Sequence, residues 1–179
     1  AILAASVGYS LMSFIMTATP LQIVNVCKLG DSASATVIQW HVIAMFAPSF
    51  FTGSIINLLG NSKVMMMGVM LYIMSICFGI MGQTIQYFWI SLFLCGLGWN
   101  FLYVGGSDVI AKSALPEERA KVQGVTDFII FIFVASGSFL AGSLHNNLGW
   151  EIMMFYTSIP IFILFLSIVF INPREIKPT

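Results

Sequence analysis

Six long runs of apolar residues, separated by short polar connections, dominate the sequence. A helix needs about 20 apolar residues to cross the hydrocarbon core of a bilayer, and each run has about that length. The pattern predicts an all-α membrane protein that forms a single six-helix transmembrane domain over 1–179. Because the connections are short, we expect consecutive helices to be antiparallel neighbours. The expected helices cover about 1–24, 35–57, 64–83, 87–110, 116–143 and 151–171.

Polar residues inside these runs follow a pattern that repeats after three helices. The first and second predicted helices carry polar residues along one face, as do the fourth and fifth, whereas the third and sixth are almost wholly apolar. This order predicts two three-helix units, each with two cavity-facing helices and one supporting helix. Inverted repeats of three helices are how many secondary transporters are built. The alternative is that small hydroxyl residues only pack the helices together.

Composition supports a membrane protein and excludes several functional classes. Hydrophobic residues make up 59% of the chain and charged residues 8%, whereas soluble domains are about a quarter charged. A formal net charge of zero gives no reason to expect a nucleic-acid partner. The three cysteines are too few and too scattered for a disulfide framework or a metal site. We therefore expect neither a metal nor a cofactor.

The basic residues are distributed unequally between the two predicted sides of the membrane. Six lie in connections or in the tail on one side, and a single lysine lies on the other. The positive-inside rule then places the C-terminus and the start of the first helix in the cytoplasm, in a multi-pass protein of the plasma (inner) membrane. Because the chain starts directly in a helix, we expect a segment to be missing before it. The basic residues are Lys63, Lys112, Arg119, Lys121, Arg174 and Lys177 on the inner side and Lys28 on the outer side.

The connection after the second predicted helix resembles a loop motif of the major facilitator superfamily, Gly-x-x-x-Asp-Arg-x-Gly-Arg-Arg/Lys. Gly53 and Gly60 match the two glycines in register. Asn57 stands where the motif has Asp, Asn61 stands where it has Arg, and Lys63 supplies a positive charge one residue late. The connection therefore retains the glycines of the motif but lacks its acid and its arginines.

Further stretches are similar to the same superfamily. The segment 115–119 resembles its Pro-Glu-x-Arg segment, and 41–53, 96–106 and 122–128 look like the C-terminal half of poorly characterised bacterial members. The resemblance implies one half of a secondary active transporter of a small solute, working by alternating access and coupled to protons. It implies a small-molecule substrate, the lipid bilayer, and either a missing N-terminal six-helix half or a second copy as partners.

The resemblance also implies a cytoplasmic gate. Glycine lets helix backbones approach closely or turn tightly, and charged residues can latch the gate. The alternative interpretation is that these loops only set topology and cap helices. The gate candidates are Gly53, Asn57, Gly60, Lys63, Asp108 and Arg119.

Asp127 and His41 are the candidates for proton coupling, because an ionisable group inside a membrane is costly and is usually retained for function. Asp127 lies two to three turns into the fifth predicted helix and shares a face with Gln123. The structural alternative is that Asp127 is held by the helix N-terminus or paired with Arg119 or Lys121. For His41 the alternative is a hydrogen bond within a helix interface.

Five residues near the predicted midplane are candidate substrate contacts: Tyr9, Ser13, Trp99, Asn100 and Tyr103. They offer hydrogen bonds and an aromatic wall at the depth where transporters bind their substrates. Plain packing is the alternative for the tryptophan.

Other functions fit the sequence less well. An intramembrane serine protease needs a Gly-x-Ser-Gly nucleophile and a nearby histidine, but Val134 precedes Ala135-Ser136-Gly137 and the last predicted helix has no histidine. We therefore expect no enzyme. A channel subunit would need a filter segment longer than any connection here. A small membrane scaffold without active transport would leave the doubled polar pattern unexplained. We expect His145 to be a loop residue.

Overall fold

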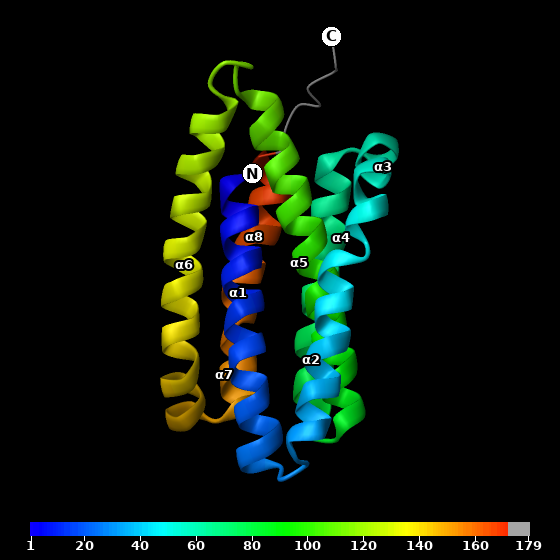
Figure 1. Cartoon of the computed structure of the whole chain (residues 1–179), viewed down its shortest axis with the longest axis vertical. Helices are drawn as coiled ribbons and strands as arrows, with labels where there is room; N and C mark the ends of the chain where they lie inside the picture. Colours follow the sequence, from blue (N-terminus) through cyan, green and yellow to red (C-terminus); the bar gives the residue numbers. More distant parts are fainter. Residues whose placement is uncertain (172–179) are drawn as a thin grey trace.

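The computed structural model describes residues 1–171, which fold almost entirely into helices aligned along one axis (Figure 1). Five helical segments are long and apolar enough to cross a membrane, and α2 with α3 makes a sixth span that is bent by 43°. The predicted all-α membrane fold is confirmed. The elements are α1 (Ile2–Pro20), the π-helix η1 (Leu21–Val26), α2 (Asp31–Phe46), α3 (Ser49–Leu59), α4 (Asn61–Met81), α5 (Ile85–Ser113), α6 (Arg119–Leu148), α7 (Trp150–Tyr156) and α8 (Ser158–Ile171).

Single glycines make two of the turns between helices. Gly60, with φ of 85°, ends α3 and precedes α4, and Gly149, with φ of 77°, ends α6 and precedes α7. Glycine adopts this left-handed conformation without a Cβ penalty, so one residue is enough to reverse the chain. As a result α6 extends five residues beyond its expected end at 143. His145 lies inside α6 and is buried, so our expectation of a loop residue was wrong.

Proline accounts for the irregular points of the long helices. Pro20 is followed at once by the π-helix η1, and Ala47 and Pro48 separate α2 from α3. Proline has no N–H to donate and its ring clashes with the carbonyl four residues earlier, so a regular helix is interrupted there. Pro160 lies in the first turn of α8. N–H groups in a first turn have no partner within the helix, so the missing N–H of proline costs no hydrogen bond there.

The packing of the helices has the symmetry of a three-helix inverted repeat. In this repeat α1 corresponds to α5, α2 to α6 and α4 to α8. The contact between α2 and α5 thus corresponds to the contact between α6 and α1, and the contacts α1–α5 and α4–α8 each correspond to themselves. Exchanging the unit α1–α4 with the unit α5–α8 maps these contacts onto one another. The corresponding helices α1 and α5 run in opposite directions (Figure 1). This is the arrangement that the doubled polar pattern predicts.

The best-packed interface lies between α4 and α5, at the centre of the bundle. A Cβ added at Gly98 would lie 2.9 Å from the Tyr72 ring and 3.0 Å from the Gly68 carbonyl oxygen, so the two backbones approach closely. The hydroxyl of Tyr72, which is fully buried, donates to the carbonyl of Gly8 on α1 over 2.6 Å. Thus α1, α4 and α5 form one rigid unit.

Candidate functional site

Three of the predicted substrate contacts meet where α1 crosses α5. Trp99 and Tyr103 are one turn apart on α5 and stack with ring centroids 5.2 Å apart and planes 7° from parallel. Tyr9 of α1 meets both rings edge-on, at 5.2 Å and 71° from Trp99 and at 5.4 Å and 77° from Tyr103. Aromatic rings prefer these offset-stacked and edge-to-face arrangements.

Two phenylalanines extend this group at its margins. Phe46, at the end of α2, lies 5.7 Å from Trp99, and Phe131 of α6 lies 5.8 Å from Tyr9. Trp99 is only 4% exposed, whereas Phe46 is 57% and Phe131 54% exposed. We call Tyr9, Phe46, Trp99, Tyr103 and Phe131 the aromatic cluster. The sequence gives no signal for the two phenylalanines, because they lie among many other apolar residues of the same runs.

Unpartnered polar atoms surround the aromatic cluster. Among the described residues, Trp99 Nε1, Ser6 Oγ and Ser107 Oγ are buried and have no hydrogen-bond partner. Ser6 is one turn before Tyr9 on α1, and Ser107 is one turn after Tyr103 on α5. A buried polar group without a partner costs about 1–3 kcal/mol. A bound molecule with acceptor atoms could therefore gain hydrogen bonds here.

Ser13 serves helix packing in this structure. Its hydroxyl lies 2.6 Å from the Ser138 hydroxyl, and the nearby Ser10 hydroxyl donates to the carbonyl of Phe133 over 3.0 Å. A Cβ added at Gly137 would lie 2.9 Å from Ser10 Oγ, so small residues bring α1 and α6 close together. This is the packing role that we kept as the alternative for hydroxyl residues.

Asn100 is fully buried and stabilises the break between α2 and α3. Its Nδ2 donates to the Met45 carbonyl over 2.7 Å and to Ser49 Oγ over 2.6 Å. Its Oδ1 accepts a 2.6 Å hydrogen bond from Thr52 Oγ1. The structure therefore places this amide in the interface between α5 and the bent span, with its hydrogen-bonding atoms occupied by protein groups.

The two candidates for proton coupling lie in different surroundings. His41 is fully buried between α2 and α5, with Nδ1 2.7 Å from the Leu92 carbonyl and no partner for Nε2 within the described part of the chain. Asp127 of α6 is half-buried and accepts a 2.9 Å hydrogen bond from Gln123 Nε2. Asp127 thus lies with Gln123 on one face of α6, whereas His41 serves a helix interface.

Asp127 makes no ion pair with Arg119 or Lys121 among residues 1–171. The alternative of a charge-paired Asp127 at the gate is thus not realised in this conformation. Arg119 is exposed at the start of α6, where its Nε donates to the Ala114 carbonyl over 3.5 Å.

At the same end of the bundle, Asp108 joins α4 to α5. Asn61 Nδ2 donates to Asp108 Oδ2 over 2.8 Å and to the Gly105 carbonyl over 3.0 Å. Lys112 forms an ion pair with the same carboxylate at 2.5 Å. Asn61 stands where the superfamily motif has an arginine, and it retains a link to an acid through a neutral amide.

The remaining gate candidates lie on the surface of this domain. Asn57 and Lys63 are exposed, and a Cβ added at Gly53 would find nothing within 4 Å. Gly53 therefore makes no close approach to another helix within the described residues, and its role at the gate stays a prediction. The tail residues Arg174 and Lys177 lie outside the described part of the chain, so the structure adds nothing about that part of the orientation.

A second polar cluster, which the sequence did not reveal, joins η1, the turn after α4, α6 and α7 at the opposite end. His145 Nε2 lies 2.8 Å from Gln22 Oε1, and Gln22 Nε2 donates to Gln83 Oε1 over 3.1 Å. Gln83 in turn donates to Glu151 over 3.4 Å. Partial burial raises the pKa of the Cys27 thiol, while its hydrogen bond with Gln22 acts in the opposite sense, and the thiol donates to Gln83 over 3.3 Å. These single polar residues at helix ends form no motif in the sequence.

Comparisons with known proteins agree with the fold. A family model described as Major Facilitator Superfamily matches residues 1–179. The chain is 44% identical over 144 residues to a protein of Brucella anthropi named riboflavin transporter RfnT. The aligned stretch covers 80% of this chain and 36% of that protein. It is 34% identical over 135 residues to the uncharacterized MFS-type transporter YdeG of Bacillus subtilis, covering 73% of this chain and 31% of that protein.

A third relative is the uncharacterized MFS-type transporter YddS of Bacillus subtilis, 30% identical over 145 residues, or 80% of this chain and 33% of that protein. The chain thus spans about a third of the length of each curated relative that it matches. The resemblance that the loop motifs suggested is confirmed.

Proposed function

The chain belongs to the major facilitator superfamily, and we propose that it forms one six-helix half of a secondary transporter that carries a small solute across the plasma membrane by alternating access. The inverted repeat of α1–α4 and α5–α8 supports this proposal. The relatives extend well beyond the third of their length that aligns with this chain, which fits a missing six-helix half as the partner. A second copy of the chain is the alternative partner.

We propose that the substrate carries a flat conjugated ring, and that riboflavin is the first candidate. The observation that carries this proposal is the aromatic cluster, in which Trp99 and Tyr103 are already parallel at 5.2 Å. A flat ring gains about 0.5–1.5 kcal/mol from each favourable aromatic contact. The free Trp99 Nε1 could donate to a ring carbonyl. The relative that is named a riboflavin transporter, at 44% identity, agrees with such a ring.

The proposed coupling ion is the proton, with Asp127 as its carrier. Asp127 is half-buried and accepts a hydrogen bond from Gln123 one turn before it, so closure of the cavity around the substrate would remove water from this carboxylate. An ionised carboxylate is costly in such a medium, and proton uptake removes that cost. Opening to water would favour release of the proton. Because His41 lies in a helix interface, it is the weaker candidate.

The basic residues support an orientation with the turns before α4 and α6, and hence the C-terminus, in the cytoplasm. In this orientation Asp108 and Asn61 lie at the inner end of the cavity. The exposed Gly53, Asn57 and Lys63 would then face the other half of the transporter when the inner gate closes. Closure against a partner would also provide the close approach that Gly53 lacks in this domain.

Uptake of radiolabelled riboflavin tests the proposal, using the complete transporter in cells that lack riboflavin uptake of their own. We expect saturable uptake that Trp99→Leu abolishes. Trp89→Leu is the matched control, since Trp89 lies on the same helix and stacks on Phe93 at 5.3 Å, outside the aromatic cluster. If Trp99→Leu takes up riboflavin as well as Trp89→Leu does, the aromatic cluster is excluded as the site. Non-saturable flux would favour a channel subunit, and no flux of any flat-ring solute would favour a scaffold.

A further inference from the structure

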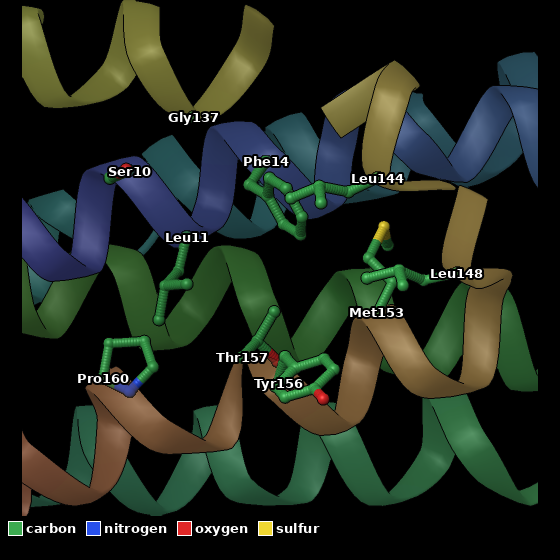
Figure 2. A pocket seen from close by; sticks show the side chains of 10 residues that line it. All are labelled: Ser10, Leu11, Phe14, Gly137, Leu144, Leu148, Met153, Tyr156, Thr157 and Pro160. Atoms are coloured by element: carbon green, nitrogen blue, oxygen red, sulfur yellow. The ribbon is translucent and has the colours of Figure 1, made fainter. Parts of the chain in front are cut away.

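A groove that the proposed transport path does not use runs between α1, α6 and the α7–α8 pair (Figure 2). It has a volume of about 260 Å³. Most of its lining is apolar and comes from all of these helices: Leu11 and Phe14, Leu144 and Leu148, and Met153 and Pro160. Figure 2 shows these side chains bordering the space from opposite sides.

The groove arises where the inverted repeat is imperfect. Where the last helix of the first repeat unit meets the first helix of the second, α4 packs tightly on α5 because Gly68 and Gly98 let the two backbones meet. The corresponding pair is α8 and α1, which touch only sparsely. No glycine occurs between Trp150 and Phe170, so α7 and α8 cannot approach α1 in the same way. The groove lies where the close contact between α8 and α1 is missing.

The polar atoms of the lining are already satisfied, apart from the exposed phenol of Tyr156. Ser10 Oγ donates to the Phe133 carbonyl over 3.0 Å, and Thr157 Oγ1 donates to the Met154 carbonyl over 2.6 Å. A groove whose only free polar side chain is an exposed phenol holds water poorly. Apolar cavities of about 150 Å³ stay dry and take up apolar molecules instead. The lining therefore selects an apolar occupant.

The position of the groove indicates where that occupant comes from. On α6 the lining extends from Gly137 to Leu148, twelve residues that span about 16 Å of helix. It therefore runs from the middle of the span to the turn between α6 and α7. Phe139 and Phe155, on the flanking helices, are 86% and 62% exposed. Because such side chains face hydrocarbon in a spanning helix, the medium beside the groove is the acyl region of the bilayer.

We propose that this groove binds one acyl chain of a membrane phospholipid, which enters from the leaflet at the α6–α7 end. One water molecule occupies roughly 30 Å³ in the liquid, and a methylene group has a similar size. The volume of the groove therefore holds about nine methylene groups. Each buried CH₂ contributes about 0.8 kcal/mol relative to water, but relative to lipid the gain comes from packing. A resident chain restores the contacts that α8 does not make with α1. This site is separate from the aromatic cluster and does not depend on the transported solute.

Photolabelling tests the acyl-chain site. The intact protein is reconstituted in vesicles of phosphatidylethanolamine and phosphatidylglycerol that contain a phosphatidylethanolamine with a diazirine at the end of one acyl chain. Labelled positions are mapped by mass spectrometry. We expect 137–148 and 153–160 to be labelled more than the lipid-exposed face of α4 around Met70 and Met74, which are 51% and 45% exposed.

A paired substitution separates the groove from the general lipid surface. Leu144→Trp fills the groove and should abolish the excess labelling. Leu140→Trp, one turn earlier on α6 and outside the lining, should leave it unchanged. If Leu144→Trp fails to insert, the comparison of the groove with α4 in the unmodified protein still decides the question.

Three results would overturn the proposal. Equal labelling of the groove and of α4, insensitive to Leu144→Trp, would mean ordinary surface lipid only. An unlabelled groove beside a labelled α4 would mean that a protein helix, from the other half or a second copy, covers it. Loss of labelling on addition of riboflavin would assign the groove to the transported solute.

Discussion

Trp99 and Tyr103 stack one turn apart on α5, and the edge of the Tyr9 ring lies against both. The tryptophan is almost fully buried, yet its Nε1 has no partner among the described residues. A buried indole normally finds an acceptor for this group. The arrangement thus combines an ordered aromatic wall with one unused donor, and the two properties can be separated by substitution.

Trp99→Phe should retain the wall and remove the donor. If the N–H donates to the substrate, its loss should weaken binding by about 1 kcal/mol, or about fivefold in Kd. Riboflavin titration of the purified transporter, followed by quenching of flavin fluorescence, measures the change. Trp89→Phe is the control on the same helix and should bind normally. An unchanged Kd for Trp99→Phe would leave the indole with a packing role only.

Asn100→Leu should destabilise the fold rather than raise KM. The substitution leaves the buried Met45 carbonyl without the amide that donates to it at the α2–α3 break, whereas Ser49 is exposed and Thr52 still donates to the Pro48 carbonyl. Each buried polar group left unpaired costs roughly 1–3 kcal/mol. Thermal unfolding in detergent should show a lowered Tm, while Asn57→Leu, at an exposed position of α3, should not. A normal Tm together with a raised KM would return Asn100 to the substrate site.

The position of each residue along its helix could be predicted from the sequence, because the length and hydropathy of the apolar runs delimit the helices. The juxtaposition of Trp99 and Tyr103 followed from their spacing of one turn. The same periodicity explains why Asn100 does not join Trp99 in the aromatic cluster. Adjacent residues on a helix point about 100° apart, so Trp99 meets Tyr9 on α1 while Asn100 meets the bend between α2 and α3.

Which helices are neighbours could not be predicted from single residues. Gln22 and His145 are 123 positions apart and meet only because α6 packs on α1. The open space around Gly53 was equally hidden, since a glycine in a spanning helix can face another helix or nothing. The acyl groove depends on how closely α8 approaches α1, which apolar composition does not determine.

Asp127→Asn should abolish proton-driven accumulation while sparing substrate exchange, because the amide stands in for the protonated acid permanently. The proposed coupling rests on a half-buried carboxylate that shares a face of α6 with Gln123 and would lose water when the cavity closes. Riboflavin accumulation under an imposed pH gradient, compared with counterflow without one, separates the two activities. Glu117→Gln, in the exposed turn before α6, should behave as the unmodified protein. An unchanged accumulation ratio in Asp127→Asn would refute the coupling role.

Gly53→Val should insert normally but fail to transport. The added side chain has free space within this domain, so it should not disturb the fold. It would instead obstruct closure against the proposed other half. Gly98→Val provides the contrast, since its Cβ would lie 2.9 Å from the Tyr72 ring, and overpacking of this kind costs roughly 1–3 kcal/mol or more. Immunoblots of membranes with parallel uptake assays compare the two, and normal uptake by Gly53→Val would remove it from the gate.

The contact between Gln22 and His145 should stabilise the end of the bundle where α1, α4, α6 and α7 meet. Their 2.8 Å hydrogen bond is buried and continues through Gln83 to Glu151. Residues that share one network usually couple by roughly 0.5–3 kcal/mol in a double-mutant cycle. Gln22→Met and His145→Leu should therefore lower the Tm by less together than the sum of their separate effects. The exposed Gln39 supplies the control, since Gln39→Met with His145→Leu should be additive. Additive effects for Gln22→Met and His145→Leu would show that the network contributes no joint stability, and the four helix ends would then be held by apolar packing alone.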